Sequence, residues 1–180
     1  MLSVGCLKEN NDIDFRVSLT PETSKKLIEK DINVFIQENC GLRSGFNNED
    51  YEKVGAKLLN SSQSVIESSD ILLSISPLDI KFEKLPNNIN SKIFIGNFNF
   101  KNNIPDKRFT FLALEKIPRI ARAQSMDILS SQASIAGYQS SLLAANHLNK
   151  YFPMLITAAG TISPAKILVI GAGVAGLQAI

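Results

Sequence analysis

The sequence predicts an α/β fold built from two doubly wound, Rossmann-like domains, the second present only as its linking helix and its first strand, turn and helix. Short apolar segments alternate with helical segments over residues 3–115, which is typical of a parallel sheet with helices on both faces. An apolar segment at 167–170 then runs into the complete G-x-G-x-x-G motif of residues 171–176. A strand followed by a tight turn and a helix is the order that a dinucleotide-binding fingerprint requires.

The alternation begins with a βαβ unit. Residues 3–7 form the first expected strand, and the polar residues 8–14 form a loop. Thr20 is a good N-cap and Pro21 suits the first position of a helix, so a helix is predicted up to residue 28. Residues 31–37 form the second expected strand.

The alternation continues to residue 115. We expect a short helix over 48–56 with Asn48 as its N-cap, and another over 61–69. Pro77 should end a strand, and a polar linker should follow it. The remaining predicted segments are strands at 70–76, 91–98 and 108–115 and the linker at 81–90.

Residues 116–132 break this rhythm, because they have no clean hydrophobic period and contain side chains that can hydrogen-bond. Residues 128–149 are rich in Ala, Ser and Leu and predict a long helix whose small residues permit close packing. Ser125 or Asp127 is its expected N-cap. Residues 157–160 and 163–164 are expected to be connectors that lead into a buried strand at 167–170.

Each glycine of the motif has an expected role. Gly171 permits the sharp turn, Gly173 lets a pyrophosphate approach the backbone, and Gly176 lets the helix lie close to the strand. The helix N-terminus offers N–H groups to the phosphates. The alternative is a glycine-rich turn used only for packing. The acidic residue that holds the ribose should follow about 20 residues later, so the chain is expected to be a piece cut inside its nucleotide-binding domain.

Composition excludes several classes of function. The net charge is +2 with no block of like charges, which argues against nucleic-acid binding. The N-terminal residues lack the pattern of a signal peptide, and no apolar run is long enough to cross a bilayer. Cys6 and Cys40 are expected to be buried, reduced thiols, and no cluster of side chains has the spacing of a metal site.

The catalytic inventory is small. His147 is the only histidine and is expected to be a solvated or packed helix residue, and no serine occupies a G-x-S-x-G motif. Hydride transfer from one nicotinamide to another requires positioning and exclusion of water but no general base. A dehydrogenase of amino or hydroxy acids also needs a cation for the carboxylate and a group that handles a proton.

With these residues in view, the chain resembles the NAD(H)-binding component (domain I, the N-terminal region of the alpha subunit) of proton-translocating NAD(P) transhydrogenase, a family related to alanine dehydrogenase. The similarity covers essentially the whole chain. Its most specific segment is the stretch from Pro118 to Gln132. The other similar segments are Arg16-Val17-Ser18-Leu19-Thr20-Pro21, Ile135-Ala136-Gly137-Tyr138, residues 157–160 and 164–166, and the glycine-rich turn.

The resemblance implies three regions: an alanine dehydrogenase/transhydrogenase N-terminal domain at 1–127, a linking helix and connector at 128–164, and the start of the NAD-binding Rossmann domain at 165–180. NAD(H) is expected in the cleft between the domains. Arg119, Gln124 and Asp127 are implied to contact its nicotinamide end and to serve catalysis. The further implied contacts are Ile120, Ala121, Arg122, Ser130, Gly171, Gly173, Val174 and Gly176. The alternative is that Asp127 and Ser130 serve only as helix caps and that Arg119 and Arg122 are solvated surface charges.

The implied reaction is Re/Si-specific, reversible hydride transfer from NADH to NADP⁺, coupled to proton movement across a membrane. NADP(H) would bind a partner domain or subunit, and further partner components would span the membrane. The resemblance also implies a homodimer at the cytoplasmic or matrix-like face of the inner membrane, held there peripherally. The 180 residues alone are expected to bind NADH poorly and to be inactive.

Two alternatives remain. The first is an amino-acid dehydrogenase of the alanine type, whose pyruvate site uses an Arg, a Lys and a His. Arg16 matches that Arg, but residues 72–77 contain no Lys and residues 95–100 contain no His. Arg16 is therefore expected to be structural and to pair with a nearby carboxylate. The second alternative is a nucleotide sensor without catalytic activity.

Overall fold

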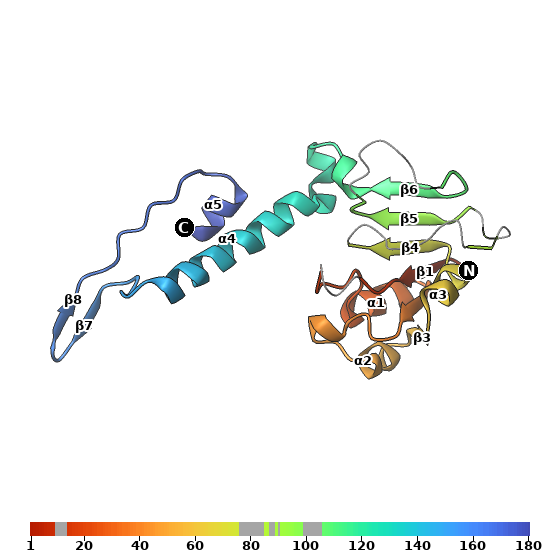
Figure 1. The fold of residues 1–180 in the computed structure, drawn as a ribbon, viewed down its shortest axis with the longest axis horizontal. Helices are drawn as coiled ribbons and strands as arrows, with labels where there is room; N and C mark the ends of the chain where they lie inside the picture. The colour runs from red at the N-terminus through yellow and green to blue at the C-terminus, as the bar shows by residue number, and fades with distance from the viewer. Residues whose placement is uncertain (10–13, 76–84, 87–88, 90, 99–105) are drawn as a thin grey trace. The chain divides into compact units, whose positions relative to one another are not determined.

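The computed structural model describes residues 1–9, 14–75, 85–86, 89, 91–98 and 106–180. They divide into two compact units, Met1–Ile117 and Pro118–Ile180, which we describe separately (Figure 1). The domain boundary that the sequence suggests at residue 127 stays a prediction for the whole protein.

The first unit is built on a parallel six-stranded sheet, which confirms the predicted α/β fold. The strand order is β3-β2-β1-β4-β5-β6, the order of a doubly wound Rossmann-like sheet. The order reverses between β1 and β4, where Val4 of β1 is paired with Ile71 of β4. The strands are β1 Ser3–Cys6, β2 Asn33–Gln37, β3 Lys57–Leu59, β4 Ile71–Ser74, β5 Ile93–Gly96 and β6 Thr110–Ala113.

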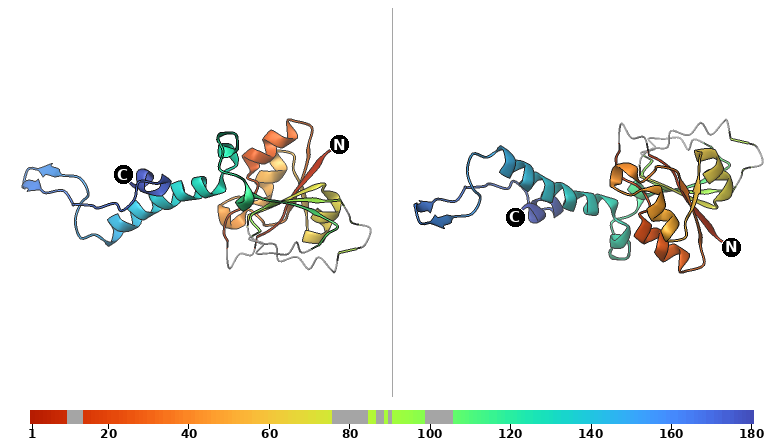
Figure 2. Two further views of the ribbon diagram at one scale, coloured as in Figure 1. Left: turned by 90° about the horizontal axis from the view of Figure 1, so that it is seen from above. Right: turned by 90° about the horizontal axis from the view of Figure 1, so that it is seen from below.

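Helices cover both faces of this sheet (Figure 2). Along β2, Val34 and Ile36 pack into one hydrophobic cluster and Phe35 into the other, because successive side chains of a strand point to opposite faces. The first cluster is closed by α1 Pro21–Ile28 and α2 Asn48–Lys53, and the second by α3 Ser62–Ser68. Short 3₁₀ helices lie at Leu42–Ser44 and Leu114–Lys116.

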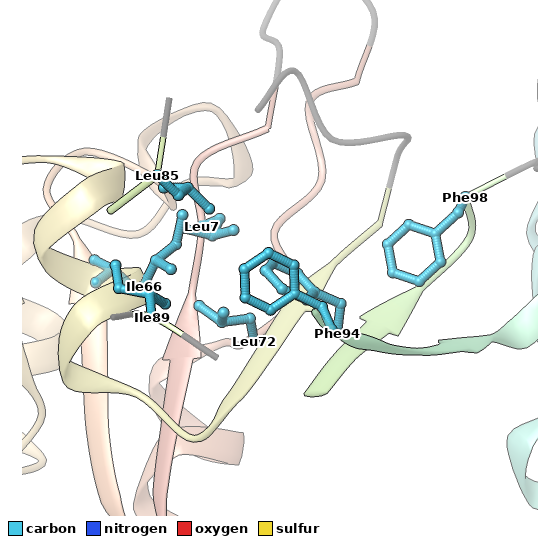
Figure 3. Close-up of a cluster of buried hydrophobic side chains, with 9 residues drawn as sticks. Leu7, Ile66, Leu72, Leu85, Ile89, Phe94 and Phe98 are labelled. Carbon is cyan, nitrogen blue, oxygen red and sulfur yellow. The ribbon is translucent and has the colours of Figure 1, made fainter. Parts of the chain in front are cut away.

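The second cluster is rich in aromatic rings (Figure 3). Phe94 of β5 is fully buried, and its ring stacks on that of Phe111 with centroids 5.2 Å apart. The Phe109 ring packs edge to face against the Phe94 ring, with centroids 5.5 Å apart. Leu72 and Ile66 extend this packing toward β4 and α3. The sheet is therefore fixed to α3 mainly through large apolar side chains.

The predicted N-cap of α1 agrees with the structure, but that of α2 does not. The Thr20 hydroxyl accepts a hydrogen bond from Thr23 N at 3.2 Å, so the predicted N-cap of α1 is confirmed. The predicted cap Asn48 is wrong by one residue. Asn47 precedes α2, and its N–H donates to Asp50 Oδ2 at 2.9 Å. Asn48 Oδ1 instead accepts from Asn39 N at 2.8 Å, so its side chain serves the preceding loop.

The strands of the sheet differ from the predicted ones in number and in length. Strand β3 was not predicted, because it has only three residues and gains its hydrogen bonds from β2 alone. The other strands occur where expected but are shorter. Pro77, most of the predicted linker at 81–90 and residues 10–13 of the predicted loop lie outside the described residues.

One polar contact joins the beginnings of β1 and β4. Asp70 Oδ2 accepts hydrogen bonds from Ser3 N at 2.8 Å and from the Ser3 hydroxyl at 2.7 Å. These bonds stabilise the ionised carboxylate, so they lower the pKa of Asp70, with a smaller contribution from the charge of Lys92.

We expect Asp70→Asn to reduce stability at neutral pH and to flatten its decline in acid. Because the folded pKa is lowered, the carboxylate contributes stability above its unfolded pKa of about 3.9. That contribution is lost as the pH falls through the folded value. The effect should not exceed about 1 kcal/mol, because the side chain is exposed and screened by water. Urea unfolding at pH 7 and pH 3 measures it. Ser3→Ala, which removes the hydroxyl that donates to Asp70 Oδ2 and accepts from Asp70 N but keeps the Ser3 N–H bond, should change the pH dependence less. An unaltered pH dependence in Asp70→Asn would contradict the prediction.

The second unit is organised on one long helix, α4 Ile128–His147, which confirms the predicted helix. A 3₁₀ helix at Ala121–Met126 precedes it, and α5 Val174–Ala179 packs beside it. Between α4 and α5 lies a hairpin of β7 Leu155–Thr157 and β8 Gly160–Ile162 (Figure 1).

Two predictions for the second unit are wrong. Residues 157–160 are not a simple connector: Thr157 pairs with Gly160 across a two-residue turn, and Gly160 adopts φ +127°, which suits glycine. Residues 167–170 do not form a buried strand, and Ile170 is 92% exposed. A strand needs a neighbour to accept and donate its backbone hydrogen bonds. Within the described residues of the chain, the sheet pairings include none for this segment.

Candidate nucleotide-binding site

The glycine-rich turn leads directly into α5. Gly171 has φ +111°, a conformation that side-chain-bearing residues rarely adopt, so the sharp turn depends on glycine there. Gly173 is the residue before α5, and its carbonyl accepts a hydrogen bond from Leu177 N at 2.9 Å. The N–H groups of the first helical turn have no partner within a helix and point outward from its N-terminus.

The second and third glycines of the motif differ in what the fold requires of them. A Cβ atom on Gly176 would lie 2.2 Å from the carbonyl oxygen of Gly171, so the turn itself excludes a side chain there. A Cβ atom on Gly173 would meet no atom within 4 Å. Gly173 also has an ordinary negative φ of −79°. Neither the space in the turn nor its backbone conformation therefore requires glycine at 173.

The turn and α5 are fixed to the middle of α4. Gly137 of α4 is buried, and a Cβ atom there would lie 2.2 Å from the carbonyl oxygen of Ala175. The Ser134 hydroxyl donates to Gln178 Oε1 at 3.0 Å, and the Ser141 hydroxyl donates to the Ala179 carbonyl at 3.1 Å. The small residues of α4 thus allow backbone-to-backbone packing, as the sequence predicted.

The segment that precedes α4 is largely open to solvent. Ala123 is buried and anchors the 3₁₀ helix. The remaining predicted site residues of this segment, Arg119, Ile120, Ala121, Arg122 and Gln124, are exposed. Their side chains are therefore available to a ligand.

Asp127 and Ser130 lie at the start of α4 and are bonded to each other. Asp127 Oδ1 accepts from Leu129 N at 2.9 Å and from Ser130 N at 3.1 Å, which confirms Asp127 as the N-cap. The Ser130 hydroxyl donates to Asp127 Oδ2 at 2.6 Å. These bonds, that of the Ser130 side chain first, lower the pKa of Asp127, and the charge of Arg119 adds to the effect. Asp127 is thus held as a carboxylate beside the exposed segment.

Ser130 shares one face of α4 with the residues that hold α5. Ser130, Ser134, Gly137 and Ser141 are spaced i, i+4, i+7 and i+11, which places them in a single row along the helix. Asp127 and Gly137 are about 15 Å apart along the helix axis. The structure therefore brings Asp127 and Ser130 together and aligns them with the turn, while the two ends of the row stay separate.

Sequence reasoning missed Ser134, Ser141 and Gln178 as residues that position the turn. The row of small residues that starts at Ser130 was the available signal, because its spacing marks one helix face. The contact with Gln178, 44 positions away from Ser134, has no signal in local sequence.

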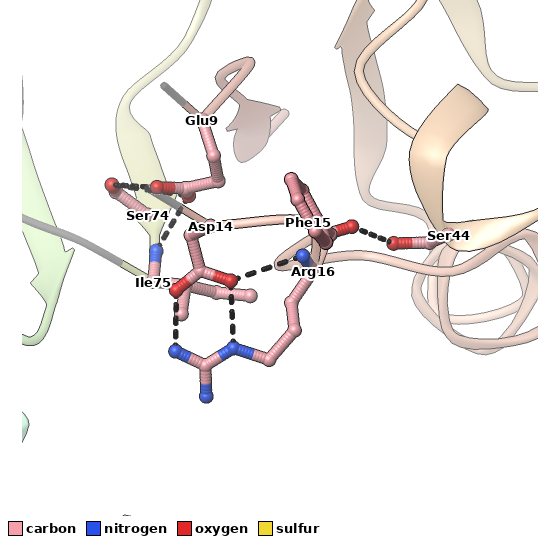
Figure 4. Close-up of polar contacts among 7 residues, drawn as sticks. All are labelled: Glu9, Asp14, Phe15, Arg16, Ser44, Ser74 and Ile75. Atoms are coloured by element: carbon pink, nitrogen blue, oxygen red, sulfur yellow. Dashed lines mark hydrogen bonds and ion pairs between the residues drawn. The ribbon is translucent and has the colours of Figure 1, made fainter. Parts of the chain in front are cut away.

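Arg16 lies in the first unit and forms an ion pair with the Asp14 carboxylate (Figure 4). Its Nε donates to Asp14 Oδ1 at 2.8 Å, and its second guanidinium nitrogen pairs with Asp14 Oδ2. The hydrogen bond to Asp14 raises the pKa of Arg16, which stays charged. The predicted structural pairing is confirmed. Nearby, the buried Glu9 accepts from Ile75 N at 2.6 Å and joins the ends of β1 and β4.

Other candidate chemistry is sparse. His147 is exposed, and its Nδ1 lies 3.0 Å from the carbonyl oxygen of Leu143. Among the described residues, no group of three or more His, Cys, Asp or Glu side chains could hold a metal ion. In the same residues, no helix has both the length and the apolar character needed to cross a membrane. Residues 76–77 and 99–100, which belong to the segments compared with the alanine dehydrogenase pattern, lie outside the described residues.

Two protein-family models match the chain. The model "Alanine dehydrogenase/PNT, N-terminal domain" matches residues 5–136, and the model "Alanine dehydrogenase/PNT, C-terminal domain" matches residues 140–180.

Curated relatives include proteins of both named groups. An NAD(P) transhydrogenase alpha-subunit protein of Rickettsia prowazekii (strain Madrid E) is 39% identical over 99% of this chain and 49% of that protein. NAD(P) transhydrogenase subunit alpha of Cereibacter sphaeroides is 35% identical over 99% of this chain and 35% of that protein. Alanine dehydrogenase of Bacillus subtilis (strain 168) is 25% identical over 98% of this chain and 47% of that protein. The chain thus spans about a third to a half of the length of these relatives.

Solved structures give the same two groups. A transhydrogenase structure from Sinorhizobium meliloti has a TM-score of 0.81 and 34% identity, and the match covers 98% of this chain and 54% of that one. An L-alanine dehydrogenase structure has a TM-score of 0.75 and 22% identity, and the match covers 99% of this chain and 50% of that one. At this identity the match shows a similar fold alone. Identity is higher to the transhydrogenase proteins in both comparisons.

Proposed function

The chain belongs to the alanine dehydrogenase/PNT family, and from this premise we propose that it is the NAD(H)-binding component of a proton-translocating NAD(P) transhydrogenase. The proposed reaction is reversible hydride transfer from NADH to NADP⁺, coupled to proton movement across a membrane. The transhydrogenase relatives, at 39% and 35% identity against 25% for alanine dehydrogenase, support this choice within the family.

The observation that carries the proposal is the shared face of α4. Gly173 leaves space open at the start of α5, and α5 is fixed to Gly137 on the same row as Ser130. A ligand whose pyrophosphate sits at Gly171, Gly173, Val174 and Gly176 would begin beside α5, which covers Ser134, Gly137 and Ser141, and would extend toward Asp127 at the start of α4. The helical rise of about 15 Å from Asp127 to Gly137, where α5 packs, is longer than a single phosphate group.

The exposed segment then receives the nicotinamide end. Arg119, Gln124 and Asp127 supply a cation, an amide and a carboxylate that can orient the ring and its carboxamide by hydrogen bonds. Ile120, Ala121 and Arg122 offer further contacts from the same segment. NAD(H) supplies the hydride, while the residues of this chain orient it and exclude water. Because hydride transfer between two nicotinamides moves no proton to the substrate, the scarcity of general bases agrees with the proposal.

NADP(H) would bind a partner domain or subunit that docks over the Arg119–Asp127 segment. Further components would span the membrane, so that this chain is peripheral to its cytoplasmic or matrix-like face, as a homodimer. The named relatives, alpha subunits of a transhydrogenase, support the existence of partner subunits.

An amino-acid dehydrogenase of the alanine type is the second candidate, because alanine dehydrogenases belong to the same family. Its carboxylate-binding Arg would be Arg16, whose Nε and one terminal guanidinium nitrogen are bonded to the Asp14 carboxylate. A substrate carboxylate would have to share this guanidinium with Asp14. The lower identity to alanine dehydrogenase, 25% against 39%, favours the transhydrogenase.

One assay separates these functions. The full-length natural protein that carries this sequence is mixed with its NADP(H)-binding partner, and NADH-dependent reduction of an NADP⁺ analogue is followed by absorbance. The proposal expects hydride transfer only when the partner is present. NADH oxidation that depends on pyruvate and ammonia and needs no partner would show that the protein is an alanine-type dehydrogenase. NADH binding without any hydride transfer would indicate a sensor.

In the same full-length protein, Asp127→Asn is expected to slow hydride transfer at least about tenfold while NADH affinity changes less. Asparagine caps a helix about as well as aspartate, so this change removes the charge and retains the cap. Single-turnover kinetics and NADH titration measure the two effects. Gln124→Ala should show the same imbalance, and Ser131→Ala, whose hydroxyl bonds only within α4 to Ile128, serves as the control. Equal losses of rate and affinity would argue against a positioning role.

A further inference from the structure

The two cysteines of the chain meet inside the first unit, although 34 positions separate them. Cys6 is the last residue of β1, and Cys40 lies in the loop that follows β2. Their sulfur atoms are 3.9 Å apart, and both side chains are buried, Cys6 fully and Cys40 to 4% exposure. The sequence predicted buried thiols, which is confirmed, but it did not predict that they are neighbours.

The hydrogen bonds around Cys6 define which thiol donates. Ser18 Oγ lies 3.1 Å from Cys6 Sγ and 3.2 Å from the carbonyl oxygen of Leu73, to which its hydroxyl donates. Since that hydroxyl has one proton, the Cys6 S–H is the donor to Ser18. The Cys40 S–H is then placed to donate to Cys6 Sγ. This bond lowers the pKa of Cys6 and raises that of Cys40, which makes Cys6 the more readily ionised thiol.

We propose that Cys6 and Cys40 form a reversible dithiol–disulfide pair that small disulfides such as oxidised glutathione can oxidise. Neighbouring thiols inside a folded domain have a high effective concentration toward each other. In a reducing compartment such disulfides are transient and serve redox sensing. The pair is therefore a modification site distinct from the nucleotide site of the second unit.

The reaction occurs in two exchange steps. The Cys40 thiolate attacks one sulfur of oxidised glutathione, which forms a mixed disulfide and releases one glutathione thiolate. The Cys6 thiolate then attacks Cys40 Sγ, which forms the Cys6–Cys40 bond and releases the second glutathione thiolate. The two protons of the protein thiols pass to the two released thiolates, and the protein loses two electrons to the glutathione disulfide.

The position of Cys40 explains why it reacts first. Cys6 lies in β1, which is paired on both sides within the sheet, whereas Cys40 lies in a loop and directly follows the exposed residue Asn39. Local opening of a loop costs less free energy than opening a central strand. When the loop opens, Cys40 loses both the burial and the Cys6 bond that raise its pKa.

Oxidation has a structural consequence near Arg16. A disulfide removes the Cys6 S–H, so the hydrogen bond to Ser18 is lost. The Cys40 loop also contacts the chain before Ser18, because the Ser44 hydroxyl donates to the Phe15 carbonyl at 2.6 Å (Figure 4). The Arg43 guanidinium lies 3.7 Å from the Phe15 ring centroid. Oxidation of the pair thus changes contacts at both ends of the segment from Phe15 to Ser18, which includes Arg16.

The test is a thiol–disulfide equilibrium of the 180-residue chain in graded mixtures of reduced and oxidised glutathione, folded in buffer and unfolded in urea. After acid quenching, free thiols are alkylated and the species are identified by intact mass. We expect an intramolecular disulfide to form. The ratio of [GSH]² to [GSSG] at which half of the chains are oxidised should be at least about tenfold higher for the folded chain than for the chain in urea. Peptide mapping should then show Cys6 joined to Cys40.

Three results would overturn the proposal. They are an equal or lower ratio in the folded chain, disulfide-linked dimers as the main product, and a mixed disulfide with glutathione that does not proceed to the intramolecular bond. Cys6→Ser and Cys40→Ser are the matched controls. Cys6→Ser should accumulate the mixed disulfide on Cys40, and faster labelling of Cys6 in Cys40→Ser than of Cys40 in Cys6→Ser would contradict the assigned order of attack.

Discussion

Gly173→Asp is expected to weaken NADH binding on the order of 100-fold while leaving α5 intact. Aspartate is among the best N-cap residues, and the structure leaves open space where its Cβ atom would lie, so the helix that begins at Val174 should form at least as well. The new carboxylate would face the pyrophosphate. Two like charges about 4 Å apart repel by roughly 4 kcal/mol at the effective dielectric constant of a protein surface, and partial screening reduces this.

The measurement is a titration of NADH fluorescence in the full-length natural protein, with circular dichroism as the check on folding. Gly173→Ser is the matched control, because serine caps equally well and adds no charge. It should cost clearly less affinity than aspartate. Unchanged NADH affinity in Gly173→Asp would mean that the glycine-rich turn serves packing alone, which is the alternative that the sequence left open.

Phe94→Ala should destabilise the first unit by about 3–5 kcal/mol, because it removes the fully buried ring at the centre of the aromatic cluster. Phe94 contacts Phe111 and Phe109 at centroid distances of 5.2 and 5.5 Å, so truncation leaves a cavity that two rings on the neighbouring strand and loop must fill. A loss of this size is a large fraction of the stability of a typical domain.

Urea unfolding followed by circular dichroism, with the free energy extrapolated to water, measures the change. Leu112→Ala on β6 is the control, since Leu112 is half exposed and its removal leaves no enclosed cavity. Its effect should be several times smaller. Similar losses in the two variants would mean that the aromatic cluster is not the main source of stability of the sheet.

The elements that the sequence predicted well depend on contacts close in the chain. The N-caps Thr20 and Asp127 and the length of α4 follow from hydrogen bonds to residues two to four positions away. The glycine-rich turn follows from backbone conformation at Gly171. The parallel sheet followed from the alternation of apolar and helical segments, because strands that run in the same direction need a crossover between them.

The predictions that failed depend on distant partners. Residues 167–170 have the composition of a buried strand, but composition does not provide a neighbouring strand, and they remain exposed. Strand β3 has too few residues for a periodic signal and exists because β2 offers it a free edge. The hairpin at 155–162 likewise depends on a pairing that begins at Gly160.

The sequence by itself therefore determined the α/β class, the family resemblance and the residues of the nucleotide motif, because these are written in spacing and in residue type. Only the tertiary structure decided that Ser130 and the glycine-rich turn lie on one face of α4, that Arg16 is occupied by Asp14, and that Cys6 meets Cys40. The physical reason is that these contacts depend on how the backbone folds back on itself. The two cysteines are 34 positions apart, and nothing in the residues between them indicates the distance between their sulfur atoms.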